Sequence, residues 1–354
     1  MTTPGSVPTP YLRVDTARLR ANVARAAERA AAARVGLRPH AKTHKCVEVA
    51  RLQLAAGAAG LTVATTGEAE VFAEHGVEDL FVAYPLWPDA GVARRLRNLA
   101  GRVDLAVGVD SVEGAHRLGS TLAGAGLAVL VEVDSGQHRT GVPPADAGAV
   151  AAAAAEAGLA VRGVFTFPGH AYAPAAGATG AADEAAALAT AVASFRDAGL
   201  EPDVVSGGST PTLESSLAGP GVLTELRPGV YVFGDAQQWE LGSTGPEDVA
   251  LTCRSTVVSH TGGRVVLDAG SKVLGADRPP WASGWGRLPA YPAARVVQLA
   301  EHHAVVDLAG APLPPLGARV DVVPNHVCAA VNLADVLWAD DTEPWPVAAR
   351  GRNG

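Results

Sequence analysis

"DLAVGVDSVEGAHRLGSTLAGAGLAVLVEVD" (104–134) holds two apolar runs, 104–110 and 127–134, separated by a stretch long enough for one helix. Val and Leu dominate both runs, as is typical of strands buried in a sheet. A strand, a helix and a second strand in this order predict a βαβ unit with parallel strands.

The same alternation extends in both directions from this segment. Alanine-rich stretches with helical character, such as 149–158 and 182–199, separate the apolar runs. The eight runs cover residues 35–42, 60–66, 79–85, 104–110, 127–134, 161–169, 203–210 and 225–232. Eight alternations predict an α/β protein with a (β/α)₈ TIM barrel, and a doubly wound open sheet is the alternative.

The character of the sequence changes after residue 245. Segments such as "ALTCRSTVVSH" and "GARVDVVPNHVC" are β-rich, with Gly and Pro turns between them. We therefore predict a barrel domain at 16–245 and a C-terminal all-β domain at 246–354. An early strand at 8–15, which contains "YLRVD", is expected to join the second domain.

The composition bears on two questions: whether the protein binds nucleic acid, and in which cellular compartment it is located. The formal net charge of −8 gives no basic surface for nucleic acid. Three scattered cysteines do not form a disulfide framework, and no apolar stretch is long enough to span a membrane. The segment "MTTPGSVPTPYLRVD" lacks the apolar core of a signal peptide, so the cytoplasm is the expected location.

The segment "RPHAKTHK" (38–45) contains two of only three lysines in the chain. If 35–42 is the first strand, Arg38, His40 and Lys42 share one face. Lys42 then stands at the carboxyl end, where the active sites of barrels lie. We predict that Lys42 performs covalent chemistry and that Lys45 points elsewhere. A solvated lysine at the end of a strand is the alternative.

Two glycine-containing segments follow the last two apolar runs. "SGGSTPT" (206–212) offers backbone N–H groups and the hydroxyls of Ser209 and Thr210, and "RPGVY" (227–231) offers the amides of Gly229 and Val230. Loops at this place in a barrel commonly bind phosphate. An ordinary turn is the alternative.

The segment "VPNHVCAAVNLAD" (323–335) contains a histidine and a cysteine two residues apart. On a strand, His326 and Cys328 would face the same side, and imidazole with thiolate suits zinc. Two protein ligands leave coordination positions for water and substrate, as a catalytic zinc requires. A buried cysteine beside a structural histidine is the alternative.

Taken in order, the motifs resemble those of a known family over about residues 10–340. The group is the D-serine dehydratases and D-threonine aldolases, which are fold-type III pyridoxal phosphate enzymes related to alanine racemase. The motifs are "RPHAKTHK", "EVDSGQHRTGV", "PGHAY", "SGGSTPT", "ELRPGVYVFGDA", "LDAGSK" and "PNHVCAAVNL".

The resemblance implies a fold and a set of site residues. The implied fold is an N-terminal barrel followed by a β domain, and family members are often homodimers. Lys42 is implied as the residue that carries pyridoxal 5'-phosphate. The further implied residues are Arg139 and Tyr172 for the cofactor ring, Thr210, Gly229 and Val230 for its phosphate, and His326 and Cys328 for a divalent metal.

The metal motif bears on the type of reaction. His-x-Cys resembles the zinc-dependent dehydratases, whereas His-x-Asp is typical of aldolases that use manganese-like metals. The resemblance therefore implies a zinc-dependent dehydratase, an ammonia-lyase that converts a D-3-hydroxy amino acid such as D-serine to a keto acid and ammonia, with Mn²⁺ or another divalent metal also compatible. Phe165 and "FTFPGHAY" depart from the tyrosine-containing stretch of D-serine dehydratases, which leaves the substrate open.

Three rival functions remain. Retro-aldol cleavage to glycine and an aldehyde is the alternative within the family. A racemase needs no metal, and a non-catalytic carrier of pyridoxal phosphate needs neither the His-x-Cys pair nor a second domain.

Overall fold

The computed structural model describes residues 7–354, which divide into two compact units. The barrel unit comprises residues 26–42, 53–229 and 352–354. The β unit comprises the described residues up to Arg25 together with 43–52 and 230–351. Helices α1 (Thr16–Ala33) and α2 (Val47–Ala55) contribute residues to both units.

The barrel unit contains a sheet of eight parallel strands in the order β2-β9-β8-β7-β6-β5-β4-β3. An isolated parallel bridge between His40 and Thr62 connects the segment after β2 to β3, so the ladder returns to its start. The strands are β2 (Gly36–Leu37), β3 (Leu61–Val63), β4 (Asp79–Pro85), β5 (Asp104–Val109), β6 (Ala128–Glu132), β7 (Ala160–Phe165), β8 (Val204–Gly207) and β9 (Glu225–Leu226). The predicted (β/α)₈ barrel is therefore confirmed, and the open sheet is excluded.

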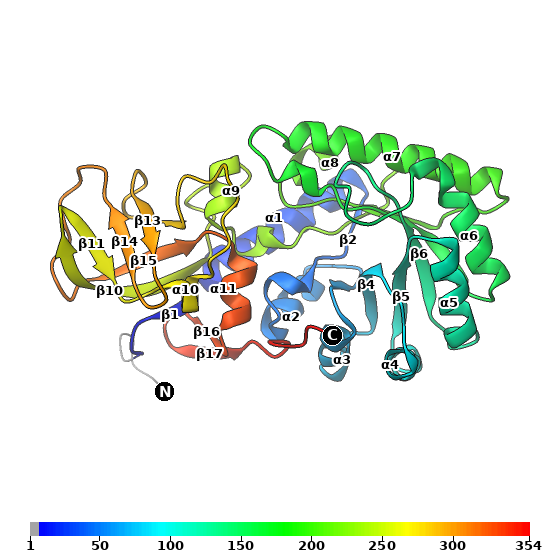
Figure 1. The fold of residues 1–354 in the computed structure, drawn as a ribbon, viewed down its shortest axis with the longest axis horizontal. Helices are drawn as coiled ribbons and strands as arrows, with labels where there is room; N and C mark the ends of the chain where they lie inside the picture. Colours follow the sequence, from blue (N-terminus) through cyan, green and yellow to red (C-terminus); the bar gives the residue numbers. More distant parts are fainter. Residues whose placement is uncertain (1–6) are drawn as a thin grey trace. The chain divides into compact units, whose positions relative to one another are not determined.

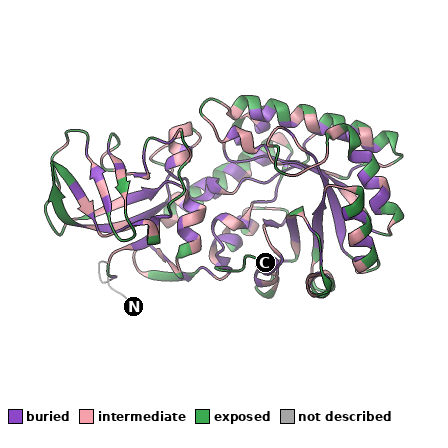
Figure 2. Cartoon of the chain, viewed as in Figure 1, coloured by how far each residue is buried: buried purple, intermediate pink, exposed green. Residues whose placement is uncertain are grey.

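Helices follow the strands and cover the outer side of this sheet, as α5 and α6 do in Figure 1. They are α3 (Thr66–Glu74), α4 (Ala90–Ala100), α5 (Val112–Leu122), α6 (Ala147–Glu156), α7 (Gly177–Asp197) and α8 (Leu213–Ala218). Asp89 and Ser111 cap α4 and α5 by accepting from backbone N–H groups of the first turn. Figure 2 shows the strands buried and the outer faces of the helices exposed.

The interior of the barrel unit combines an aromatic cluster with buried charges. Phe81 and Phe165 meet edge to face at 4.9 Å, and the guanidinium of Arg227 lies 5.8 and 5.3 Å from their ring centres. Arg227 donates to Ser206, and Ser206 donates to Glu225 at 2.7 Å. A charge buried in this way needs partners on several sides: the hydrogen bonds join β8 to β9, and the Phe165 ring adds a contact with β7.

The β unit is built on a mostly antiparallel sheet. Strand β1 (Tyr11–Val14) pairs antiparallel with β10 (Leu251–Thr261), so the strand expected at 8–15 joins the later part of the chain. The other strands are β11 (Arg264–Leu267), β12 (Gly286–Arg287), β13 (Arg295–Leu299), β14 (Ala304–Asp307), β15 (Arg319–Pro324), β16 (Val336–Ala339) and β17 (Glu343–Pro346). Three short helices, α9 (Ala236–Leu241), α10 (Ser271–Leu274) and α11 (Val327–Leu333), accompany the sheet.

Within residues 7–354, no helix has both the length and the apolar character that crossing a bilayer requires.

Candidate active site

Lys42 lies in a short 3₁₀ turn, η1 (Ala41–Thr43), that follows β2. Regular strand pairing ends at Leu37, and Pro39 has no N–H group with which to continue a ladder. The prediction that Lys42 stands on a strand face is therefore wrong. Its position beyond the carboxyl end of the first strand, where barrel sites form, agrees with the structure.

The ring of Phe167 brings three of the predicted cofactor residues together in the barrel unit. Lys42 Nζ lies 5.5 Å from the ring centre, and the guanidinium carbon of Arg139 lies 5.3 Å from it. The ring of Tyr172 is 6.0 Å away, centre to centre. An amine, a guanidinium and two aromatic rings in one place fit an aldehyde cofactor with a flat aromatic ring.

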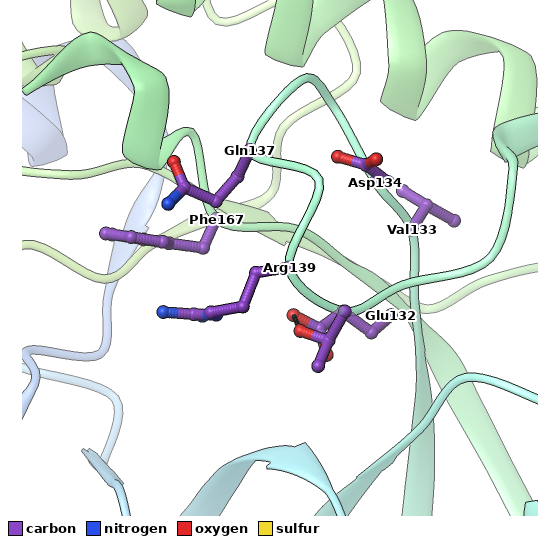
Figure 3. A pocket seen from close by; sticks show the side chains of 7 residues that line it. Glu132, Val133, Asp134, Gln137, Arg139 and Phe167 are labelled. Carbon is purple, nitrogen blue, oxygen red and sulfur yellow. Dashed lines mark hydrogen bonds between the residues drawn. The ribbon is translucent and has the colours of Figure 1, made fainter.

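A small pocket adjoins this cluster. Figure 3 shows Arg139 beside Phe167, with Glu132 at the end of β6, just before the loop that carries Arg139. The lining residues are Glu132, Val133, Asp134, Gln137, Arg139, Thr140 and Phe167.

The glycine loop after β8 is held from behind by Glu184 of α7. Glu184 Oε1 accepts from the N–H of Gly208 at 2.5 Å, and Thr212 Oγ1 accepts from the N–H of Ser209 at 2.9 Å. The prediction that these amides are exposed for phosphate is therefore wrong, because the protein already satisfies them. A Cβ at Gly207 would lie 2.4 Å from Glu184 Oε1, so close packing against this carboxylate accounts for the glycine.

The remaining residues predicted to bind the phosphate belong to different units of the structure. Thr210 is buried in the barrel unit, and Gly229 follows β9 in the same unit. Val230 opens the 3₁₀ turn η4 (Val230–Val232) of the β unit. The assignment of these three residues to a phosphate stays a prediction.

Gly229→Glu provides a test of this prediction. The larger anionic side chain should crowd and repel a phosphate, and cofactor affinity should fall by on the order of tenfold or more, since charge-assisted bonds are worth ~1.5–3 kcal/mol each. Fluorescence titration with pyridoxal phosphate measures the change, and Gly219→Glu, at a glycine with open space around it, is the control. Unchanged affinity in a folded variant would place the phosphate elsewhere.

His326 and Cys328 lie at the start of α11, not on a strand as predicted. Strand β15 ends at Pro324, and His326 occupies the N-cap position of the helix. The two side chains are nevertheless near each other: burial lowers the pKa of His326, and the neighbouring Cys328 raises it. Their grouping thus comes from the first turn of a helix.

Other groups of the β unit complete the surroundings of this pair. Asp277 bonds the Nδ1 atom of His326, and the thiol of Cys328 lies 3.4 Å from Thr43 Oγ1. A carboxylate behind a histidine is the usual arrangement around metal-binding imidazoles, because it fixes the ring and leaves the other nitrogen for the metal.

The electrostatics of the pair suit a cation. Burial lowers the pKa of His326, but Cys328, Asp277 and Asp235 together raise it to about 11. Across residues 7–354 there is no group of three or more His, Cys, Asp or Glu side chains arranged to hold a metal. The assignment of His326 and Cys328 to a metal stays a prediction.

Lys45, the second lysine of the motif, has a structural place in the β unit. Its Nζ donates to Asn332 Oδ1 at 2.8 Å, and Asn332 belongs to α11, the helix that carries Cys328. Lys272 lies on the surface, 3.9 Å from Glu301. The three lysines thus have separate surroundings.

Several residues of the site escaped the sequence reasoning. Phe167 and Arg227 lie within the motifs "FTFPGHAY" and "RPGVY" but were assigned no role, and Asp277 lies in none of the quoted motifs. Glu132 could have been noticed as an acidic residue between two valines in the apolar run 127–134, since a buried charge in a strand is rarely incidental.

Comparison with protein families gives two adjoining matches. Residues 14–237 match the model of the alanine racemase N-terminal domain, and residues 250–339 match a putative serine dehydratase domain.

Similar proteins span nearly the whole chain. A D-threo-3-hydroxyaspartate dehydratase from Delftia sp. is 34% identical, with 91% of each chain covered. A D-threonine aldolase from Arthrobacter sp. is 33% identical, covering 98% of this chain and 93% of the relative.

Solved structures give the same picture. The Delftia dehydratase superimposes with a TM-score of 0.87 at 33% identity, covering 96% of this chain and 97% of that one. A D-threonine aldolase from Filomicrobium marinum gives 0.86 at 31% identity, with 99% of both chains covered. The chain therefore belongs to the D-serine dehydratase and D-threonine aldolase family, a group of pyridoxal phosphate-dependent lyases of fold type III related to alanine racemase.

Proposed function

We propose that this protein is a zinc-dependent dehydratase that removes water from a D-3-hydroxy amino acid and releases a keto acid and ammonia. The observation that carries the proposal is the His326–Cys328 pair backed by Asp277. A thiolate with an imidazole is a softer donor set than manganese prefers, and it suits zinc.

The relatives support this choice of metal residues. Solved structures of D-threo-3-hydroxyaspartate dehydratase include a cysteine-to-alanine variant in the metal-free form and a histidine-to-alanine variant, at positions two residues apart. His326 and Cys328 have the same spacing. They would hold a divalent metal, which supplies a positive charge that helps a hydroxyl to leave.

Lys42 is the residue that we assign to the cofactor and to the movement of the proton. Bound pyridoxal phosphate supplies an aldehyde for covalent attachment and an electron-withdrawing ring. Lys42 would carry the cofactor at rest and, once displaced by the substrate amine, use Nζ to take the α-proton. Arg139 and Tyr172 would hold the ring, and Thr210, Gly229 and Val230 the phosphate.

Aldol cleavage is the second candidate. It is favoured by the Arthrobacter aldolase, whose identity to this chain is nearly that of the dehydratase. In this case the products are glycine and an aldehyde, and no ammonia is released.

The proposal extends to organisation and location. We place the boundary between the two family domains near residue 245, between the two matched family models, although the compact units of the structure divide between Gly229 and Val230. We also propose a cytoplasmic homodimer, for which light scattering on the purified chain and cell fractionation are the tests.

A substrate panel tests the proposed function. D-Serine, D-threo-3-hydroxyaspartate and their L isomers are supplied separately to the zinc-loaded enzyme, and keto acid and ammonia are measured together. We expect equal amounts of both products from at least one D isomer and none from its L isomer. Turnover of L isomers alone would contradict the assignment.

A further inference from the structure

Glu132, at the end of β6, has a buried carboxyl group that is only half satisfied. The residue is 3% exposed, and its Oε1 accepts from Thr140 Oγ1 at 3.0 Å. Its Oε2 is equally buried, yet it has no hydrogen-bond partner anywhere in residues 7–354. A buried acceptor left in this way is costly, so either a proton or another donor is needed there.

The loop after β6 folds back and brings Arg139 to the same pocket. Val133 bridges Val142, and the N–H of Val142 donates to the carbonyl of Glu132 at 3.0 Å. Both Glu132 and Arg139 line the pocket beside Phe167 (Figure 3). They form no ion pair in the structure, where the exposed guanidinium of Arg139 lies over the Phe167 ring instead.

The charges that face Glu132 come from three elements. Burial raises the pKa of Glu132 to about 7, against the lowering effects of Thr140 and Arg139. Arg227, after β9, lowers it further, and Asp110, after β5, raises it. The carboxyl group is thus poised between its neutral and charged forms near neutral pH.

We propose that Glu132 is a positioning residue for Arg139: its unpartnered Oε2 accepts from the guanidinium when pyridoxal phosphate fills the site, and this pair fixes Arg139 against the cofactor. The inference rests on the proposed role of Arg139 in the cofactor site. Thr140 holds the other oxygen, so the carboxylate is already oriented for its partner. An arginine fixed by a carboxylate loses less freedom when it binds a ligand.

The proposal requires a pH dependence with a definite sign. In the free protein Glu132 holds a proton below about pH 7, whereas its pair with Arg139 needs the carboxylate. Binding of the cofactor must therefore expel this proton, and affinity should rise with pH up to about 7. Because the cofactor and Lys42 also titrate, the informative quantity is the ratio of the affinities of the native enzyme and a variant.

Glu132→Gln provides the test. The full-length holoenzyme is dialysed to equilibrium at pH 6 and pH 8, and retained pyridoxal phosphate is measured by its visible absorbance. We expect the ratio of native to Glu132→Gln affinity to rise ~10-fold from pH 6 to pH 8, since one proton is released per cofactor bound. Glu70→Gln, which breaks an ion pair with Arg95 elsewhere in the barrel unit, should leave a ratio that does not change with pH.

A second variant guards against a purely structural loss. Arg139 is exposed, so Arg139→Gln should fold. It should also remove the rise in cofactor affinity between pH 6 and pH 8 that depends on Glu132. Addition of Glu132→Gln to Arg139→Gln should then change nothing further. Two results would overturn the inference. One is a native-to-Glu132→Gln affinity ratio that is the same at pH 6 and pH 8, and the other is a pH-dependent rise in affinity that Arg139→Gln retains. A native enzyme that fails to retain the cofactor would instead refute the proposed function.

Discussion

Replacing Lys42 by alanine is expected to abolish both the visible absorbance of the bound cofactor and the activity. Lys42 is the lysine that lies by Phe167 with Arg139, and it is proposed both to carry the cofactor and to move the α-proton. Loss of a general base alone costs ~10²–10⁴-fold in rate, and loss of the covalent link adds to this. Absorbance spectra and initial rates of the purified variant measure the two effects.

Lys45→Ala is the matched control, three residues further along the chain. It should retain the cofactor absorbance, although loss of the partly buried hydrogen bond to Asn332 should lower the free energy of unfolding by ~1.5–3 kcal/mol. Borohydride reduction of the native holoenzyme followed by peptide mapping locates the label directly. A label on Lys45 or Lys272 would refute the assignment of Lys42.

Removal of the metal is expected to have the second-largest effect. The purified enzyme should contain one zinc per chain, and chelation should lower turnover by on the order of 10³-fold, because Lewis-acid stabilisation is worth several kcal/mol. The circular dichroism spectrum and the visible cofactor absorbance should not change, since two protein ligands do not make a structural site. The test is to measure the zinc content, the two spectra and the turnover rate on the same sample before and after chelation.

Cys328→Asp sharpens the same test. An oxygen donor in place of the thiolate should weaken zinc binding and favour manganese. Some aldol cleavage is also expected in this variant. Full activity of metal-free native enzyme, or a variant with unaltered preference for zinc, would contradict the role of the pair.

Much of the barrel could be predicted from the sequence because its strands are short apolar runs between alanine-rich helices. The run at 79–85 coincides with β4, and the run at 104–110 with β5 except for its last residue. The first and last strands were overextended, since β2 and β9 have two residues each. Pro39 and Pro228 interrupt the apolar pattern at these strands, and the chain turns away soon afterwards.

The local structure around the chemical residues was harder to predict. The alternation rule places Lys42 on a strand face, but a single turn of 3₁₀ helix changes the direction of the side chain. "NHVCAAVNL" contains both Val and Ala, so it fits a strand end as well as a helix start. Strand β15 ends at Pro324, and helix α11 begins soon afterwards. His326 and Cys328 therefore come together at the start of a helix and not on one face of a strand.

The partners of the site could not be found from sequence because they depend on the fold. Asp277 meets His326 across 49 residues, and Phe167 becomes the centre of the cluster only through the barrel. The glycine loop was predicted to offer its amides to a phosphate, yet the N–H groups of Gly208 and Ser209 bind Glu184 and Thr212. A pair of glycines signals close approach of another group, but it does not reveal which group approaches.

Product analysis with D-threonine tests the central claim most directly, because its two possible reactions share no product. The zinc-loaded native enzyme is incubated with D-threonine, and keto acid, ammonia, glycine and acetaldehyde are measured in the same sample. A dehydratase is predicted to give 2-oxobutanoate and ammonia in equal amounts, without glycine. Glycine and acetaldehyde without keto acid would contradict the account and make the protein an aldolase despite Cys328.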